Sequence, residues 1–327
     1  MPQPNAKRAS KQRSYQFFLG VDGGGTKTNI AIANDAGEIV VEGSGGPSNP
    51  LRVGVETAVT NIIKAADSAC DLAGLSRGDI VAATLGLAGV RRTDIRERVR
   101  ESFIERYSIR KTHVTTDADI ALYGTTLGKS GAVVIAGTGS ICLGVNDDGV
   151  MAIAGGWGPI AGDEGGGRGI AEQALHSIAK ASDGRGPLTK LSEQAAEYFR
   201  ASSVENLIGA IYAPQMDNSR IAGFARLVVE AAIDGDRIAV DIINNAGREL
   251  GTAAIAVLRR LGLEKRKVPI GCVGSIFNAG SLLTDPMIEL INKTAPKAYL
   301  QEPLMPPSHA GALMAMKNGT NGYRKEK

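Results

Sequence analysis

The strongest constraint on the fold is an internal repeat, in which two stretches of the chain match at a constant offset of 112 positions, 137 − 25. A Gly-Thr pair at residues 25–26 corresponds to another at 137–138, and each lies between two apolar runs. The second run of each stretch ends in an NDxG turn, at residues 34–37 and 146–149. Because a run, a glycine loop, a second run and a turn keep their register without a gap, the pattern predicts a duplicated α/β unit.

Hydrophobic periodicity predicts the same order of elements twice: three strands in a hairpin meander, then alternating helices and strands. The expected strands are residues 17–21, 29–33, 39–42, 80–87, 114–116, 132–135, 141–145, 150–154, 268–273 and 298–300. The expected helices are residues 54–73, 94–103, 169–182, 193–200, 221–233, 239–261 and 310–317. This order predicts α/β domains over residues 15–118 and 119–309 with a cleft between them, and helix 310–317 is able to join the first domain.

Composition narrows the function classes. A chain of 327 residues, 43% hydrophobic and 22% charged, is long enough for two globular domains. Residues 1–13 hold four Lys or Arg and no acid, so the net charge of +3 becomes −1 without them (3 − 4). We read residues 1–14 as a disordered polar tail, and we expect neither nucleic acid nor a membrane as a partner. Cys70, Cys142 and Cys272 lack CxxC spacing, which predicts neither a disulfide nor a zinc site and favours a cytoplasmic protein.

The stretch LGVDGGGTKT, residues 19–28, joins a predicted strand to another strand, so it matches neither the Walker A nor the dinucleotide pattern. Glycine lets backbone amides approach an anion closely, which makes this loop a candidate phosphate site. The expected ligands are Asp22 for a metal ion and, for the phosphates, Gly24, Gly25, Thr26, Lys27 and Thr28. The alternative is a glycine-rich hairpin corner with one surface aspartate.

Two further stretches extend this interpretation. The matching loop AGTGS supplies Gly137, Thr138, Gly139 and Ser140. The stretch CVGSIFNAG at residues 272–280 suits close approach of an adenosine at Gly274 and Ser275, although alone it is typical of an ordinary strand-to-helix junction. Two glycine loops on two domains would hold a polyphosphate from both sides, with Mg²⁺ between the phosphates and Asp22.

Five stretches, taken in order, resemble the sugar-kinase and BadF-type branch of the actin, hexokinase and Hsp70 superfamily, and most of all the N-acetylglucosamine kinases. They are LGVDGGGTKT, TTDADIAL, VVIAGTGS, GGWGPIAGDEGG and CVGSIF. The resemblance extends from Phe17 to about Lys317. It implies a duplicated ribonuclease H-like (actin-like ATPase) fold, ATP and Mg²⁺ as cofactors, phosphoryl transfer to the hydroxyl of a small amino sugar, and a homodimer.

The resemblance also assigns roles. Asp117, at the end of the predicted strand 114–116, would be the catalytic base that takes the proton of the sugar 6-hydroxyl. The alternative role for Asp117 is that of a helix N-cap, and Asp119 is a second candidate for that role. The implied sugar contacts are Asn49, Asp117, Thr138, Gly156, Trp157, Asp163 and Gly167. Asn49 is also typical of a turn before Pro50, Trp157 would also suit a core, and Glu164 is either a second ligand or a solvated charge.

One segment departs from the family pattern. GDEG is usually followed by Ser, a small residue and an aromatic, whereas this chain has Gly166, Gly167 and Arg168. Position 167 lines the acetyl pocket in the family, so a wider pocket or a nearby arginine would suit a bulkier or acidic sugar. We expect N-acetylglucosamine as the substrate, with glucosamine or N-acetylmuramic acid as the alternatives.

Two other classes share parts of this pattern. An ATPase activator of a 2-hydroxyacyl-CoA dehydratase needs thiolates close together for an iron–sulfur cluster, which the spacing of the three cysteines does not favour. A non-catalytic sugar sensor would be marked by loss of the aspartates at 22 or 117, and both are present. His113, His176 and His309 lie near no cysteine pair, so the zinc cluster of ROK sugar kinases is not expected.

Overall fold

The computed structural model describes residues 16–321, so the tail predicted at residues 1–14 lies outside the described residues. These residues form two compact units, one of residues 16–120 with 307–321 and the other of residues 121–306. Each unit is built on one five-stranded sheet. Among the helices that the structure describes, none is long and apolar enough to cross a membrane.

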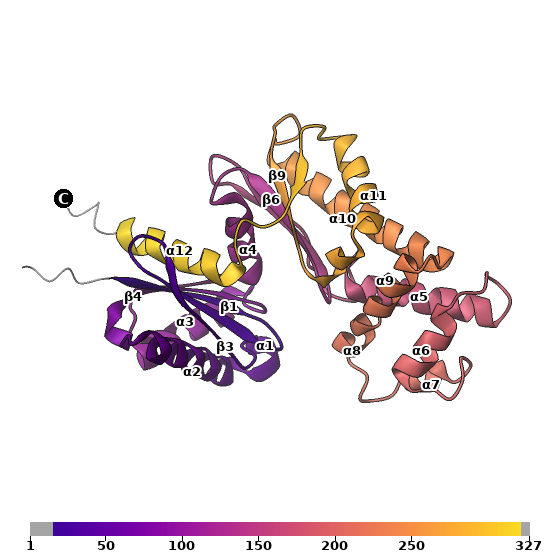
Figure 1. The fold of residues 1–327 in the computed structure, drawn as a ribbon, viewed down its shortest axis with the longest axis horizontal. Coiled ribbons are helices and arrows are strands. Elements are labelled where there is room, and N and C mark those ends of the chain that lie inside the picture. The colour runs from indigo at the N-terminus through magenta and orange to yellow at the C-terminus, as the bar shows by residue number, and fades with distance from the viewer. Residues whose placement is uncertain (1–15, 322–327) are drawn as a thin grey trace, which may run out of the picture. The chain divides into compact units, whose positions relative to one another are not determined.

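The first unit contains β1 (Phe17–Gly23), β2 (Thr28–Ala33), β3 (Ile39–Gly45), α1 (Pro50–Val53), α2 (Val55–Ala73), η1 (Arg77–Asp79), β4 (Ile80–Leu87), α3 (Thr93–Tyr107), β5 (Thr112–Thr116) and α12 (Pro307–Asn321). Its sheet has the order β3-β2-β1-β4-β5, in which the hairpin pairs are antiparallel and β1, β4 and β5 are parallel. Helices α2 and α3 cover one face, and α12 covers the other by packing on β1, β2 and β4 (Figure 1). α4 (Asp117–Thr126) follows β5 and continues into the second unit.

The second unit contains β6 (Gly131–Ala136), β7 (Ser140–Val145), β8 (Met151–Gly155), α5 (Gly167–Ser182), α6 (Leu191–Phe199), α7 (Leu207–Ile211), α8 (Asn218–Gly223), α9 (Ala225–Ile233), α10 (Arg237–Arg260), β9 (Pro269–Val273), η2 (Ser275–Ala279), α11 (Ser281–Asn292) and β10 (Tyr299–Gln301). Its sheet order is β10-β9-β6-β7-β8. The long helix α10 packs on β6, β7 and β8, and α11 packs on α10 (Figure 1).

The predicted duplication is confirmed by the topology and by matching turns. When β6 to β10 are set against β1 to β5, the two sheets have the same strand order and the same parallel and antiparallel pairs. β2 and β7 differ by the same 112 positions at both ends. In each NDxG turn, the side-chain oxygen of Asn34 or Asn146 accepts hydrogen bonds from the amides two and four residues later. Gly37 and Gly149 both adopt the left-handed φ, at 81° and 77°, that such a turn requires.

All predicted strands form, with ends that shift by at most three residues. The prediction of one helix over 221–233 is wrong, because α8 ends and α9 begins at Phe224. The amide of Phe224 closes a tighter turn with the carbonyl of Ile221, at 3.1 Å, and its buried ring packs on Tyr198 and Phe199. The sequence pattern did not predict α11, because Pro286 lies inside that helix and is unfavourable there by local propensity.

Candidate active site

The Asp22 carboxylate lies at the carboxyl end of β1, at the same edge of the sheet as the end of the parallel strand β5. It accepts a 3.0 Å hydrogen bond from the side-chain amide of Asn29, the residue opposite it on β2. Burial raises the pKa of Asp22 above its ordinary value, and the Asn29 hydrogen bond and the charge of Lys27 act against this shift. One Asp22 oxygen accepts no hydrogen bond from residues 16–321, so it is available to a cation.

The first glycine loop leaves consecutive amides without acceptors. The Gly24 amide closes the turn on the carbonyl of Lys27 at 2.9 Å. In the described part of the chain, the amides of Gly25, Thr26 and Lys27 donate no hydrogen bond. Three neighbouring amide donors beside a half-buried carboxylate make a site that suits a phosphate with its cation.

The structure gives the hydroxyls of Thr28 and Ser140 internal partners. Thr28 is fully buried, and its hydroxyl donates to the carbonyl of Gly46 at 2.6 Å and also lies 2.7 Å from the Ser48 hydroxyl. Ser140 occupies the equivalent position of the repeat and donates to the carbonyl of Glu164 at 2.6 Å. Both hydroxyls therefore hold the segment after the third strand of each meander against the loop, instead of pointing to a phosphate as the sequence analysis expected.

Asn49 is tied directly to the first loop. Its amide donates to the carbonyl of Gly24 at 3.1 Å, and its side-chain oxygen caps α1 by accepting from the amide of Leu51 at 2.9 Å. The turn role considered from the sequence is thus present. Its side-chain NH₂ donates to no residue within 16–321, so the cap still leaves a donor for a sugar oxygen.

Asp117 and Asp119 have different partners, which separates the two roles that the sequence left open. Thr116 caps α4, because its hydroxyl accepts from the amide of Asp119 at 3.2 Å. The Asp119 carboxylate completes this capping box by accepting from the amide of Thr116 at 3.0 Å and from the hydroxyls of Thr115 and Thr116. The Asp117 carboxylate accepts from the adjacent amide of Ala118 at 2.9 Å and from no side chain of the described residues. Burial raises the pKa of Asp117, and the negative charges of Asp22 and Asp119 raise it further. A carboxylate of raised pKa accepts a proton more readily, as a general base must.

The second glycine loop is fixed to the start of α5. The Gly137 amide bonds to the carbonyl of Gly139 at 2.9 Å, while the amides of Gly167 and Arg168 donate to Gly137 and Thr138 at 2.8 and 2.9 Å. In the part of the chain that the structure describes, the amides of Thr138 and Gly139 donate no hydrogen bond. This loop therefore also presents open donors for an anion.

Asp163 lies against the second loop. It is buried and has the left-handed φ of 66°, which is uncommon for a residue with a side chain. Its carboxylate accepts from the Ser140 amide at 3.3 Å and covers Gly139, where any side chain would overlap it. Burial raises the pKa of Asp163, the Ser140 hydrogen bond opposes the shift, and Glu164 adds to it. The Glu164 side chain itself is exposed, as a solvated charge would be.

A cavity of about 410 Å³ in the second unit brings together residues that are far apart in the sequence. Gly137 and Thr138 of the second loop line it together with Ser275 of η2. Gly274, at φ 113°, lies so close to the backbone of Ala136 that only glycine fits there. The rest of the lining was not predicted from the sequence. It comes from α8, α9 and η2 and includes Ser219, Ala222, Arg226, Glu230, Ile233 and Asn278. No periodicity signal marked these residues, because their helices face the cavity with polar and apolar side chains mixed.

The core alternative for Trp157 is wrong, since its side chain is 74% exposed. Gly155, Gly156 and Gly158 around it all adopt positive φ, at 76°, 70° and 82°. Ile160, three residues on, is completely exposed. The segment thus presents an indole at the surface beside the second loop, as a ligand-contacting residue would be presented.

A model of the BadF/BadG/BcrA/BcrD ATPase family matches residues 19–315. The chain belongs to this family. The match confirms the resemblance that the glycine loops and the GDEG segment indicated.

Curated relatives of this chain are amino-sugar kinases by name. The chain is 33% identical over 285 residues to the N-acetylmuramic acid/N-acetylglucosamine kinase of Clostridium acetobutylicum, covering 87% of this chain and 93% of that one. It is 32% identical over 322 residues to the N-acetyl-D-glucosamine kinase of Dictyostelium discoideum, covering 93% and 98%. A crystal structure from Chromobacterium violaceum, provisionally named an N-acetylglucosamine kinase, superposes with a TM-score of 0.75 at 24% identity over 92% of this chain and 99% of that one. This likeness confirms the duplicated ribonuclease H-like fold.

The segment that departs from the family pattern is tightly packed in this structure. A methyl group added at Gly166 would lie 2.5 Å from the carbonyl carbon of Gly139, and one at Gly167 would lie 3.0 Å from the carbonyl oxygens of Gly137 and Ala222. The missing side chains therefore allow backbone segments to approach each other. They do not open the wider pocket that the sequence analysis considered at this position.

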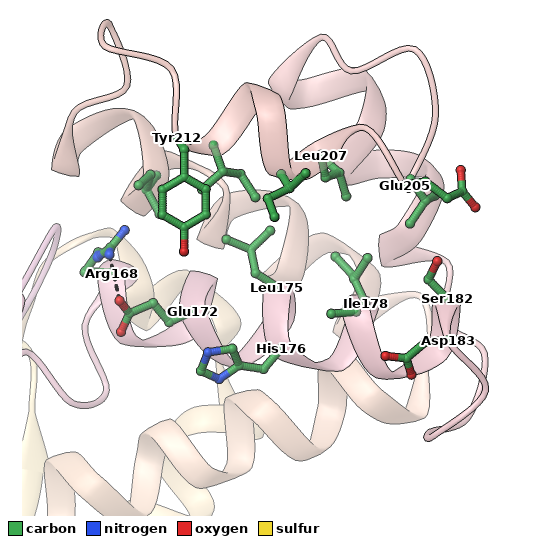
Figure 2. Close-up of a pocket in the computed structure, with 15 residues that line it drawn as sticks. Arg168, Glu172, Leu175, His176, Ile178, Ser182, Asp183, Glu205, Leu207 and Tyr212 are labelled. Carbon is green, nitrogen blue, oxygen red and sulfur yellow. Dashed lines mark hydrogen bonds and ion pairs between the residues drawn. The ribbon is translucent and has the colours of Figure 1, made fainter.

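The Arg168 side chain points into a separate cavity of about 580 Å³ that α5 and α7 line (Figure 2). Its guanidinium forms an ion pair with Glu172 at 2.6 Å, one turn further along α5 (Figure 2). Aliphatic side chains such as Leu175, Ile178 and Leu207 line the middle of this cavity. Glu172 thus neutralises the arginine that the sequence analysis considered as a contact for an acidic sugar.

Proposed function

We propose that this protein is an ATP-dependent amino-sugar kinase that transfers the γ-phosphate of ATP to the 6-hydroxyl of N-acetylglucosamine. The observation that carries the proposal is the half-buried Asp117 carboxylate directly after β5, which has a raised pKa and accepts no side-chain hydrogen bond among the described residues, while the Asp119 carboxylate is held by Thr115 and Thr116. The names of the curated relatives support the substrate class.

In this proposal, the loop amides hold the phosphates and the side chains around them orient the sugar. The amides of Gly25 to Lys27 and of Thr138 and Gly139 bind phosphate oxygens, and the cavity beside Ser275 takes the adenosine. As Asp117 accepts the proton of the 6-hydroxyl, the sugar oxygen forms a bond to the γ-phosphorus. The bond from that phosphorus to the bridging oxygen breaks, and ADP leaves with the electron pair. Asn49, Asp163 and Trp157 position the sugar by hydrogen bonds and contact.

The donor set around Asp22 fits Mg²⁺. This ion commonly binds through one or two carboxylates together with substrate phosphates and water. Over residues 16–321, no group of three or more His, Cys, Asp or Glu side chains forms a metal site, which fits a metal carried with the nucleotide better than a metal held by the protein alone. Asp22, with one oxygen open, would hold it directly or through water. When bound, Mg²⁺ neutralises charge that builds up on the phosphates.

The packing around α5 favours N-acetylglucosamine over N-acetylmuramic acid. An acidic sugar would gain from a cation with open donors, but the Arg168 charge is compensated by Glu172. A bulkier sugar would gain from free space at Gly166 and Gly167, which backbone atoms occupy. N-acetylmuramic acid and glucosamine are therefore the alternative substrates in this proposal.

The other two classes fit less well. Cys70 and Cys142 are buried, burial raises the pKa of both thiols, and the two lie in different units. Buried thiols of raised pKa are poor candidates to hold an iron–sulfur cluster at a subunit interface. A sugar sensor without catalysis would have no need for a base of raised pKa beside a metal-type aspartate.

The test is ADP release from Mg·ATP with N-acetylglucosamine, glucosamine, N-acetylmuramic acid, N-acetylmannosamine and glucose, one at a time. We expect the highest kcat/KM with N-acetylglucosamine and a 6-phosphate product by ³¹P NMR. Faster turnover of N-acetylmuramic acid would overturn the substrate preference, and binding of ATP without turnover of any sugar would favour the sensor class.

We also propose a cytoplasmic homodimer with domains bounded near residues 118 and 309, which sedimentation and limited proteolysis would test.

A further inference from the structure

Arg52 lies in a turn that is bonded to the first glycine loop. The amides of Ser48 and Asn49 both donate to the carbonyl of Gly24, at 3.0 and 3.1 Å. The amide of Arg52 in turn donates to the carbonyl of Asn49 at 3.0 Å, within the short helix α1. Two backbone hydrogen bonds therefore connect the residues before α1 to the loop, and the third holds the Arg52 backbone on Asn49.

The Arg52 guanidinium occupies the space above Gly25. A methyl group added at Gly25 would lie 2.8 Å from Nη1 of Arg52 and 3.0 Å from its Cδ. Gly25 does not have a positive φ, so its backbone conformation is open to other residues. Glycine at position 25 thus leaves room for the arginine side chain to lie against the loop.

The contact of Arg52 with the first loop and its backbone bond to a proposed sugar contact indicate which phosphate it would meet. The guanidinium of Arg52 lies against the loop whose amides at Gly25, Thr26 and Lys27 are open. Asn49, a proposed sugar contact, precedes Arg52 by three residues. The adenosine cavity belongs to the other unit. The phosphate group nearest the sugar is the one that is transferred. A guanidinium offers planar paired donors that match phosphate oxygens better than a point charge does.

We propose that Arg52 is a catalytic residue that donates hydrogen bonds to the non-bridging oxygens of the transferred phosphoryl group. This inference rests on the proposed kinase function. Arg52 transfers no proton in this step: the hydroxyl proton goes to Asp117, and the electron pair of the broken P–O bond stays on ADP. Its contribution is to stabilise the charge spread over the three phosphoryl oxygens as the bond to ADP lengthens.

The first test compares Arg52→Met, Arg52→Lys and the control Arg92→Met, whose wild-type side chain is exposed and paired with Asp94 in the same unit. We expect Arg52→Met to lower kcat by about 100- to 1,000-fold with a KM for the sugar within about two-fold of wild type. Arg52→Lys should recover part of the rate, and Arg92→Met should match wild type. In a fourth variant, Arg52→Ala, added guanidine should recover more of the rate than Arg52→Lys does. A kcat of Arg52→Met within about three-fold of wild type would overturn the proposal.

A second readout does not depend on turnover of any sugar. Calorimetry would compare binding of Mg·ADP alone and with tetrafluoroaluminate, which imitates the phosphoryl group in flight. We expect Arg52→Met to bind Mg·ADP like wild type and to lose the additional affinity that the fluoride complex gives. Equal gains in both proteins would overturn the role of Arg52, whereas a wild type that binds both but phosphorylates no amino sugar would reject only the proposed function.

Gly25→Ala supplies an independent check, because its methyl group would displace the guanidinium. We expect this variant to lose rate in the wild-type background and to lose little more in the Arg52→Met background, as coupled residues do. Additive losses in the double variant would mean that position 25 acts without Arg52, and would count against the proposal.

Discussion

Asp117→Asn is the most informative single change, because it keeps the size of the side chain and removes its ability to accept a proton. The structure argues for a large effect. Asp119 is the nearest alternative carboxylate in sequence, but three hydrogen bonds from Thr115 and Thr116 hold it in the cap of α4. It is therefore not free to take over as base.

General acid–base catalysis contributes about 100- to 10,000-fold, and without a substitute base we expect the upper part of that range. This corresponds to a loss of about 1,000- to 10,000-fold in kcat, or about 4 to 5 kcal/mol of transition-state stabilisation. Affinity for Mg·ADP should stay near that of wild type. Coupled measurement of ADP release and calorimetry would test the two parts separately, and a kcat within about ten-fold of wild type would refute the role of Asp117 as base.

The same variant should be less active but more stable than wild type at neutral pH. The folded state raises the pKa of Asp117 above 3.8, so its favourable contribution is complete below that value and is lost as the pH rises through the raised pKa. At pH 7 the buried charge is a cost, and Asp117→Asn should unfold at a higher temperature than wild type, with the difference shrinking in acid. Wild-type activity should fall as the pH falls through the same pKa. A variant that is less stable than wild type at pH 7 would contradict this account.

Three further predictions follow from the site. EDTA should abolish turnover, and Mg²⁺ should restore it. Asp22→Asn should raise the Mg²⁺ concentration needed for half-maximal rate. Activity that does not depend on metal would contradict the fit of Mg²⁺ to this loop. Asp119→Ala should lower the free energy of unfolding by about 1 to 2 kcal/mol in urea, since it removes the carboxylate of the capping box at the start of α4. Gly166→Ala should cost about 1 to 3 kcal/mol because its methyl group would meet Gly139, whereas Gly209→Ala, which has open space around it, should be nearly neutral.

The repeat was predictable because it is written in local signals. Apolar alternation marks the strands, and the two NDxG turns use the same asparagine hydrogen bonds at an offset of 112 positions. Such signals act within a few residues of each other, so a linear sequence contains them. The two glycine loops were recognised in the same way, as glycines at the end of a strand.

What the sequence did not reveal depends on contacts between distant segments. Nothing local to Arg52 indicates that its guanidinium reaches Gly25, and nothing local to Thr28 indicates that its hydroxyl is used by Gly46. The capping preference of aspartate applies equally to Asp117 and Asp119, and only the folded loop shows that Asp119 takes the bonds. Trp157 had two interpretations because an indole suits both a core and a binding surface, and exposure alone separates them.

The packing of α12 on the first sheet also sets the order in which the protein can be completed during synthesis. Ala312 and Ala315 of α12 cover Ala31, Phe18 and Ala82 on that sheet, and Gly20 leaves room for the helix backbone. The ribosome makes the 186 residues of the other unit (306 − 120) before it reaches this helix, which at about 5–20 residues per second takes about 10 to 40 s. During that interval β1 has one face uncovered, so a truncation that removes α12 would leave Phe18 and Gly20 without their packing partners, on the same strand that ends at Asp22.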